Sequence, residues 1–190
     1  MRAAVLSRGK IVVRDEVAEP VPGIGQVLVE VKACGICGSD LHFARHGVSM
    51  LSLGKEMSGT LDLGAPELDL ERDIFMGHEF AGEVLDFGPD TASGIKPGAL
   101  VTSLPILMGV DGVRPIVYSN DVAGGYGERM LLTAPLLLEV PNGIRPELAA
   151  LTEPMAVGLH AVNRGNVQAG EGAIVLGCGP VGLAVVAALK

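Results

Sequence analysis

Short segments in which apolar and polar residues alternate dominate the first two-thirds of this 190-residue chain. Such alternation is typical of half-buried β-strands, and Val27–Val31 is the clearest instance. We expect four further strands, at residues 1–6, 11–13, 81–87 and 99–103. Turns rich in glycine or proline, such as Lys96-Pro97-Gly98, bound the last two. Many short strands with this punctuation predict a compact, barrel-like, mainly β domain.

The pattern changes towards the C-terminus. Residues 146–150 and 154–163 are expected to be helices, because proline suits the first helical turn. The apolar run 173–176 is typical of a buried strand, and the apolar run 183–189 indicates a helix. Between them lies Gly177-Cys-Gly179-Pro180-Val181-Gly182, and this order of strand, glycine loop and helix is typical of a dinucleotide-binding turn. The alternative is a glycine-rich turn that binds no ligand.

One strand and one helix cannot complete a doubly wound sheet, because the strand keeps an uncovered edge and uncovered faces. The acidic residue that selects NAD is expected roughly 20 residues beyond the glycine loop, past Lys190. We therefore expect residues 1–150 to form one domain and residues 151–190 to begin an incomplete second domain. On this interpretation the chain is the N-terminal part of a longer protein.

Two motifs carry candidate metal ligands. Cys37-Gly-Ser39-Asp40-Leu-His42 and Gly77-His78-Glu79 supply a thiol, imidazoles and carboxylates, the groups that bind Zn²⁺. A catalytic zinc uses three protein ligands and keeps one position open, and ligands from distant segments converge only in a folded domain. The spacing alone leaves another interpretation, a buried free cysteine and a hydrogen-bonded core histidine.

Several motifs in the same order extend this picture. They are Gly23–His42, Gly77–Val84, Lys96–Val101, Gly124-Gly-Tyr-Gly-Glu128, Thr152-Glu-Pro-Met-Ala156 and Gly177–Gly182. Together they resemble the medium-chain dehydrogenase/reductase family, in its zinc-containing alcohol and polyol dehydrogenase branch. The resemblance implies a mainly β GroES-like catalytic domain followed by the first β-α unit of a Rossmann domain. It implies an oxidoreductase that transfers hydride from an alcohol or polyol to NAD or NADP.

The resemblance also implies roles for individual residues. Cys37 and His78 match zinc ligands, and Ser39 and His42 match a relay that carries the substrate proton towards solvent. Glu153 stands where polyol-type relatives have a glutamate ligand; Glu79 is the rival, either as an alternating ligand or as a carboxylate just outside the ligands. Asp40 is expected to accept a hydrogen bond from the metal-bound histidine.

The glycine loop, with Gly177, Gly179, Pro180, Val181 and Gly182, corresponds to the family's cofactor turn. Many zinc alcohol dehydrogenases carry a four-cysteine lobe for a second, structural zinc. Residues 101–127 contain no cysteine, so we expect one catalytic zinc and no structural zinc. The segment 43–76 is longer than the family's usual connection, and we expect a long loop that forms part of the substrate-cleft rim or a solvated surface insertion.

The net charge limits the classes of binding partner that this chain is expected to have. The charge of −8 argues against a nucleic-acid or anionic-membrane partner, because both require a basic face. No long apolar run follows the N-terminus and the three cysteines suit no disulfide framework, so we expect a cytoplasmic protein.

A small-molecule alcohol is the expected partner, and we expect the full-length protein to form homo-oligomers. The 190 residues alone are expected to be inactive. The rival functions are a non-catalytic zinc-binding GroES-like module and a zinc-free quinone reductase relative, which usually lacks Cys37 and His78.

Overall fold

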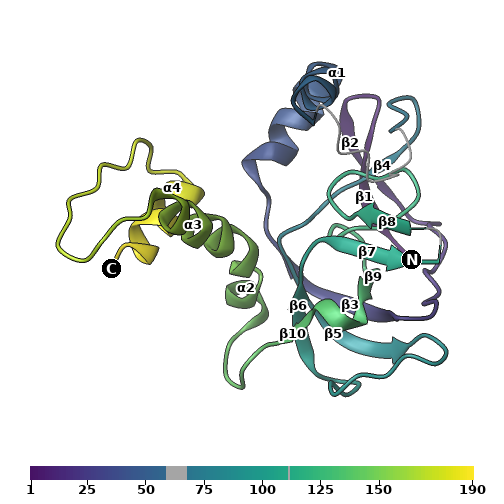
Figure 1. The fold of residues 1–190 in the computed structure, drawn as a ribbon. Helices are drawn as coiled ribbons and strands as arrows, with labels where there is room; N and C mark the ends of the chain where they lie inside the picture. The colour runs from purple at the N-terminus through teal and green to yellow at the C-terminus, as the bar shows by residue number, and fades with distance from the viewer. Residues whose placement is uncertain (59–67, 111) are drawn as a thin grey trace. The chain divides into compact units, whose positions relative to one another are not determined.

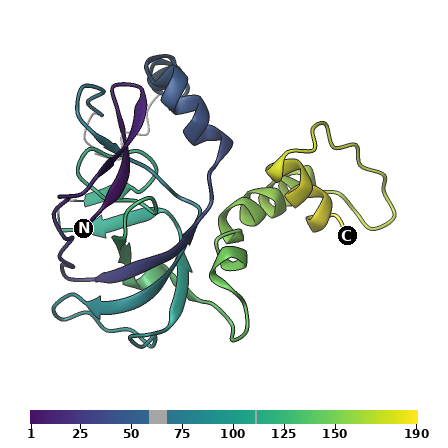
Figure 2. The same ribbon diagram turned by 180° about the vertical axis from the view of Figure 1, so that it is seen from behind.

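The computed structural model describes residues 1–58, 68–110 and 112–190, which divide into two units, Met1–Ala150 and Leu151–Lys190. Figures 1 and 2 show the first unit as a mainly β domain and the second as a pair of helices joined by a long connection. The strands of unit 1 are β1 Ala3–Ser7, β2 Lys10–Arg14, β3 Gln26–Cys34, β4 Ile74–Phe75, β5 Phe80–Phe87, β6 Leu100–Ser103, β7 Ile106–Gly109, β8 Gly112–Pro115, β9 Arg129–Thr133 and β10 Leu137–Glu139. The helices are α1 Gly38–Ser58 and α2 Pro146–Ala149 in unit 1, and α3 Thr152–Gly165 and α4 Pro180–Ala188 in unit 2.

A five-stranded sheet in the order β10-β6-β5-β3-β9 forms the centre of unit 1, and its neighbouring strands pair antiparallel. A three-stranded sheet, β2-β1-β4, and the β7-β8 hairpin complete the strands in the described part of the chain. The prediction of a mainly β domain is confirmed. The sequence pattern located five of these strands and missed β4 and β7 to β10, of which β4, β8 and β10 are short or mostly exposed to solvent.

The core of unit 1 follows the period-2 alternation of its strands. Val27 and Val29 on β3 are fully buried, and they join Phe80 and Val84 of β5 and Met130 of β9 in the main apolar cluster. Because successive side chains of a strand point to opposite faces, the residues between them lie on the other face of the sheet, where Ala81 of β5 packs against Ala149 of α2. The alternating pattern therefore defines which residues of each strand join the main cluster.

Helix α1 corrects the prediction of a long loop over residues 43–76. Its backbone is helical from Gly38 to Ser58 apart from a kink at His46, and residues 59–67 lie outside the described residues. Phe43 is buried against Leu6 of β1 and Ile74 of β4. Partly buried apolar residues at 44, 50 and 51 pack on the same cluster, and the last two lie about two helical turns beyond Phe43. This spacing is typical of one face of a helix and is visible in the sequence.

The apolar run in unit 2 differs from its prediction. Residues 173–176 were predicted to be a buried strand, yet they are not in a strand, and Ile174 and Leu176 are 89% and 93% exposed. The physical reason is that a strand needs a hydrogen-bonding neighbour, and unit 2 contains no other strand. The helices α3 and α4 were both predicted. They pack closely at Gly158, where an added Cβ would lie 2.6 Å from Ala184.

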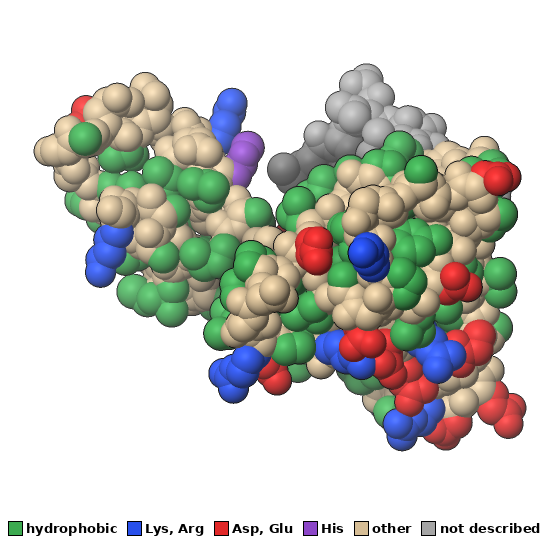
Figure 3. Space-filling view, turned by 90° about the horizontal axis from the view of Figure 1, so that it is seen from below, with side chains coloured by type: hydrophobic (Ala, Val, Ile, Leu, Met, Phe, Trp, Pro, Cys, Tyr) green, Lys and Arg blue, Asp and Glu red, His purple; other side chains and the backbone are tan. Residues whose placement is uncertain are grey.

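Charged side chains of both signs are interspersed on the face shown in Figure 3. Ion pairs of this kind include Lys32 of β3, which bridges Glu30 and Glu83. The described residues visible on this face therefore form no continuous basic surface of the type that binds nucleic acid. No helix in the described ranges is both long enough and apolar enough to cross a membrane.

Candidate metal centre

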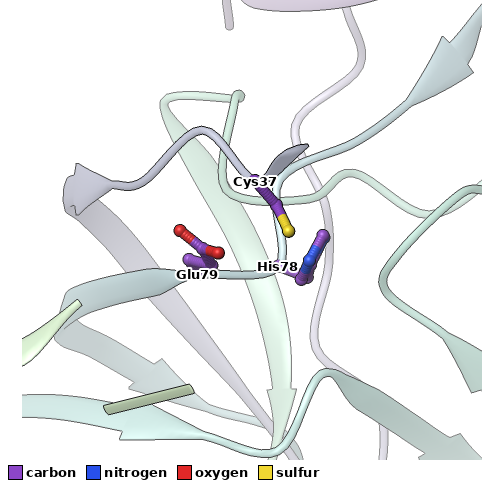
Figure 4. A group of neighbouring side chains, drawn as sticks. All are labelled: Cys37, His78 and Glu79. Atoms are coloured by element: carbon purple, nitrogen blue, oxygen red, sulfur yellow. The ribbon is translucent and has the colours of Figure 1, made fainter. Parts of the chain in front are cut away.

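Cys37, His78 and Glu79 meet at one end of the central sheet. One donor atom from each lies within 4.8 Å of the other two, and Figure 4 shows the three side chains around one space. His78 and Glu79 are buried and Cys37 is half-buried. The structure thus brings together three of the four residues predicted as metal ligands.

The pairing of β3 with β5 explains why residues so far apart in sequence converge. Cys34, the last residue of β3, lies opposite Phe80, the first residue of β5. In an antiparallel pair, the chain that leaves one strand at this point emerges beside the chain that enters the other. Cys37 therefore lies close to His78, and a backbone hydrogen bond of 2.7 Å from Gly35 N–H to the Glu79 carbonyl joins the two segments.

Two glycines allow these segments to approach. A Cβ atom added at Gly35 would collide with the Glu79 carboxylate. Gly77, immediately before His78, has φ of +99°, a conformation that residues with a Cβ rarely adopt. The need for glycine at these two positions is not visible in the sequence, because a close approach depends on which strands pair.

The Asp40 carboxylate lies beside the His78 ring, in the position predicted for the hydrogen-bond acceptor of a metal-bound histidine. Its carboxylate is 2% exposed, and its Oδ1 is 3.5 Å from His78 Nδ1. Among the residues that the structure describes, neither of these two buried atoms has a hydrogen-bond partner besides the other. A carboxylate beside Nδ1 fixes the orientation of the ring and leaves Nε2 as the ligand nitrogen, an arrangement that recurs in zinc sites.

The donor set fits zinc rather than magnesium or calcium. Thiolate and imidazole are ligands that Zn²⁺ accepts, whereas the hard ions prefer oxygen. Asp40 and Glu79 are buried carboxylates, and no lysine or arginine in the described part of the chain forms an ion pair with either. Buried charge of one sign is costly unless a counter-charge accompanies it, and a divalent cation among these residues would supply one.

Ser39 and His42 both lie in the first turns of α1. Ser39 is half-buried and His42 is exposed, so His42 is the one of the two that solvent reaches more easily. Residues three apart lie on the same side of a helix, which places the two side chains on one face. Ser39 also lies near the Tyr118 hydroxyl; burial raises the pKa of Tyr118, and Ser39 opposes that rise.

Cys34 is a partly buried residue that packs against the main apolar cluster. Burial raises the pKa of its thiol to about 12, so the thiolate that a metal or an electrophile needs is scarce. The three cysteines are free, so Cys34 and Cys37 form no disulfide.

The other predicted site residues belong to unit 2. Glu153 lies in the first turn of α3, and it remains a predicted ligand. Gly179 is the N-cap of α4 and Pro180 its first residue, so the glycine loop does lead into a helix N-terminus. Gly177 has φ of +106°, and a Cβ at Gly182 would collide with the Gly177 carbonyl. Two of the three motif glycines are thus required by the turn itself.

Comparison with known proteins agrees with this geometry. The alcohol dehydrogenase GroES-like domain family matches residues 23–142. The chain is 35% identical to (R,R)-butanediol dehydrogenase of Bacillus subtilis over all of its own length and 55% of that protein, and 30% identical to sorbitol dehydrogenase of Bacillus subtilis over all of its length and 52% of that protein.

A solved structure, a zinc-binding dehydrogenase from Sinorhizobium meliloti bound to NADP, superposes with a TM-score of 0.74 at 30% identity. The match covers 97% of this chain and 51% of the other. The chain thus spans about half the length of these relatives. With the matched residues, the antiparallel core and the Cys37, His78 and Glu79 cluster, this chain belongs to the alcohol dehydrogenase GroES-like domain family, in the zinc-containing branch of the medium-chain dehydrogenases/reductases.

Proposed function

We propose that this chain forms the zinc-binding catalytic part of an alcohol or polyol dehydrogenase that uses NAD or NADP. The observation that carries the proposal is the convergence of Cys37, His78 and Glu79, with Asp40 against the histidine ring. The names of the relatives favour an alcohol or polyol substrate. A zinc-free quinone reductase would have no use for this set of ligands.

Cys37 and His78 would hold the zinc with one glutamate, either Glu79 or Glu153. Bound zinc would supply Lewis acidity that makes a substrate hydroxyl a stronger acid. With the thiolate and one glutamate, the ligands carry two negative charges, which match the charge of the ion. A second, structural zinc is not part of the proposal, since residues 101–127 contain no cysteine.

Ser39 and His42 would move the proton that the substrate hydroxyl loses. Ser39 is the half-buried member and accepts that proton while it passes its own to His42, which is exposed and exchanges with solvent. The greater exposure of His42 supports this direction of transfer. A cofactor held at the glycine loop would supply a nicotinamide ring that accepts hydride from the carbon bearing this hydroxyl, so the two electrons that the alcohol loses would pass to the cofactor.

The cofactor would bind at the glycine loop of residues 177–182, where the N-terminus of α4 offers free N–H groups to a pyrophosphate. Residues 151–190 would then begin a Rossmann domain. We propose that such a domain is completed by chain outside these 190 residues, that the whole protein is cytoplasmic and homo-oligomeric, and that the 190 residues alone do not turn over cofactor.

Metal analysis tests the centre directly. We expect one zinc per purified 190-residue chain, lost on Cys37→Ser and retained in the control Cys178→Ser, since Cys178 is exposed and lies in the glycine loop. Comparison of Glu79→Gln with Glu153→Gln would show which glutamate is the ligand. Full zinc retention in Cys37→Ser would refute the proposed centre.

Activity requires a longer protein that contains these residues and the chain beyond Lys190. We expect it to reduce NAD or NADP with an alcohol or polyol, and zinc removal to abolish this reduction. His42→Ala should lower the oxidation rate and change its pH profile. An unchanged rate and profile would remove His42 from the relay, and robust turnover by the 190-residue chain would refute its inactivity. Stoichiometric zinc without turnover in the longer protein would favour a non-catalytic zinc-binding module.

A further inference from the structure

Tyr126 lies in the turn between β8 and β9 and reaches the metal centre from a third segment of the chain. Its hydroxyl donates a hydrogen bond of 2.6 Å to Asp40 Oδ2 and lies 3.3 Å from the Gly35 carbonyl oxygen. Since a hydroxyl has one proton, the shorter contact to the carboxylate is the principal bond. Burial, and then the Asp40 carboxylate, raise the pKa of Tyr126, so the hydroxyl remains a donor.

The two oxygens of Asp40 have separate partners. Oδ2 accepts from the Tyr126 hydroxyl and, at 3.2 Å, from the backbone N–H of Cys37. Oδ1 has no such partner and faces His78 Nδ1 at 3.5 Å. Two donors on one oxygen fix the plane of the carboxylate, which leaves the other oxygen directed at the histidine ring.

The backbone of the same turn holds the segment that carries His78. Gly125 N–H donates to the Gly77 carbonyl at 2.8 Å, and Tyr126 N–H donates to the Met76 carbonyl at 3.2 Å. The turn is therefore attached to the His78 segment through its backbone and to Asp40 through its side chain. A rigid link between a ligand and the carboxylate that orients it is what a preorganised metal site needs.

We propose that Tyr126 is a positioning residue of the metal centre, whose hydroxyl orients Asp40 so that Asp40 in turn orients His78 towards the metal. This inference rests on the proposed zinc centre. It assigns Tyr126 no contact with zinc or substrate. It gives the Tyr126 hydroxyl a role that a phenylalanine ring could not fill.

The test is Tyr126→Phe, which removes only the hydroxyl, with Tyr118→Phe as the matched control. Tyr118 is the other tyrosine of the chain; its hydroxyl lies near Ser39, no hydrogen bond in the described part of the chain joins it to Asp40, and its ring stacks on Phe43. Zinc affinity is measured by competition with a chelating dye, and the absorption spectrum of the cobalt-substituted protein reports ligand geometry. We expect about tenfold weaker zinc binding and a shifted cobalt spectrum for Tyr126→Phe alone, the lower end of the 10–100-fold losses typical of such residues.

A double-mutant cycle separates positioning from general stability. If Tyr126 acts through Asp40, Tyr126→Phe should add little to the loss of zinc affinity in Asp40→Asn. Independent, additive losses would overturn the proposal, as would a Tyr126→Phe variant with parental zinc affinity and cobalt spectrum. A parent protein that binds no zinc would overturn the proposed centre together with this inference, so the two failures are distinguishable.

Discussion

Replacement of Gly35 by alanine tests whether the close approach of Glu79 matters to the metal centre. The added Cβ would collide with the Glu79 carboxylate, and it would lie 3.1 Å from Glu79 Cβ and 3.3 Å from Glu79 Cδ. Ordinary carbon contacts are about 3.5–4.0 Å, so the carboxylate must move by roughly 1 Å or more. The backbone of Gly35 has little freedom to move instead, because its N–H is bonded to the Glu79 carbonyl at 2.7 Å.

The expected magnitude follows from the tolerance of metal ligands. Zinc–oxygen bonds are about 2.0–2.2 Å with a tolerance of about 0.2 Å, so a shift of roughly 1 Å takes Glu79 out of reach. If Glu79 is the third ligand, zinc affinity should fall about tenfold or more, or at least about 1.4 kcal/mol. If Glu153 is the ligand, the loss should be smaller than that caused by Glu153→Gln.

Dye competition on purified protein measures this effect, and Gly38→Ala is the control. Gly38 begins α1, and an added Cβ there would meet nothing within 4 Å. Its zinc affinity should equal that of the parent. Gly35→Ala with parental zinc affinity, in a protein where Glu79→Gln loses zinc, would refute the steric argument.

Three further predictions concern neighbouring features. Gly77→Ala should lower the free energy of unfolding by about 2–4 kcal/mol in urea titrations, because a residue with a Cβ would adopt a left-handed backbone conformation and place that Cβ 2.6 Å from the backbone nitrogen of Tyr126. A loss below about 1 kcal/mol would contradict this. Iodoacetamide should label Cys178 and Cys37 of the apoprotein but not Cys34, whose pKa burial raises to about 12, and zinc should protect Cys37 alone, as peptide mass spectrometry would show. A hydrogen bond from Arg14 lowers the pKa of Asp73 to about 2. The Arg14–Asp73 ion pair should therefore stabilise the fold above about pH 4, and this stabilisation should be lost as the pH falls towards 2. In acid titrations Asp73→Asn should remove this part of the pH dependence, about 1 kcal/mol or less for an exposed pair, and an unchanged slope would contradict it.

Much of the fold was predictable from local patterns. Alternation located β1, β2, β3, β5 and β6, and proline followed by apolar residues located α2 and α3. The short strands β4 and β10 were not predictable, since two or three residues carry no periodic signal. The failure at residues 173–176 has a different cause, because an apolar run becomes a strand only where another strand pairs with it.

The candidate site was predictable to a similar extent. Cys37, His78 and Glu79 were predicted from residue chemistry and family resemblance, and the structure brings their donor atoms together. Tyr126 was missed, although the motif that contains it was noted. No sequence pattern indicates that its hydroxyl contacts Asp40.

The sequence by itself determined the chemistry available to this protein: a thiol, an imidazole and carboxylates in motifs of the zinc dehydrogenases, and a glycine loop before a helix. These follow from residue types and short spacings, which are local properties. Only the tertiary structure decided which of these groups meet. The pairing of β3 with β5 joins Cys37 to His78, Gly35 admits Glu79, and the turn at Tyr126 holds Asp40. Such contacts depend on strand register and on the space around each side chain, and both involve residues that lie far apart in the sequence.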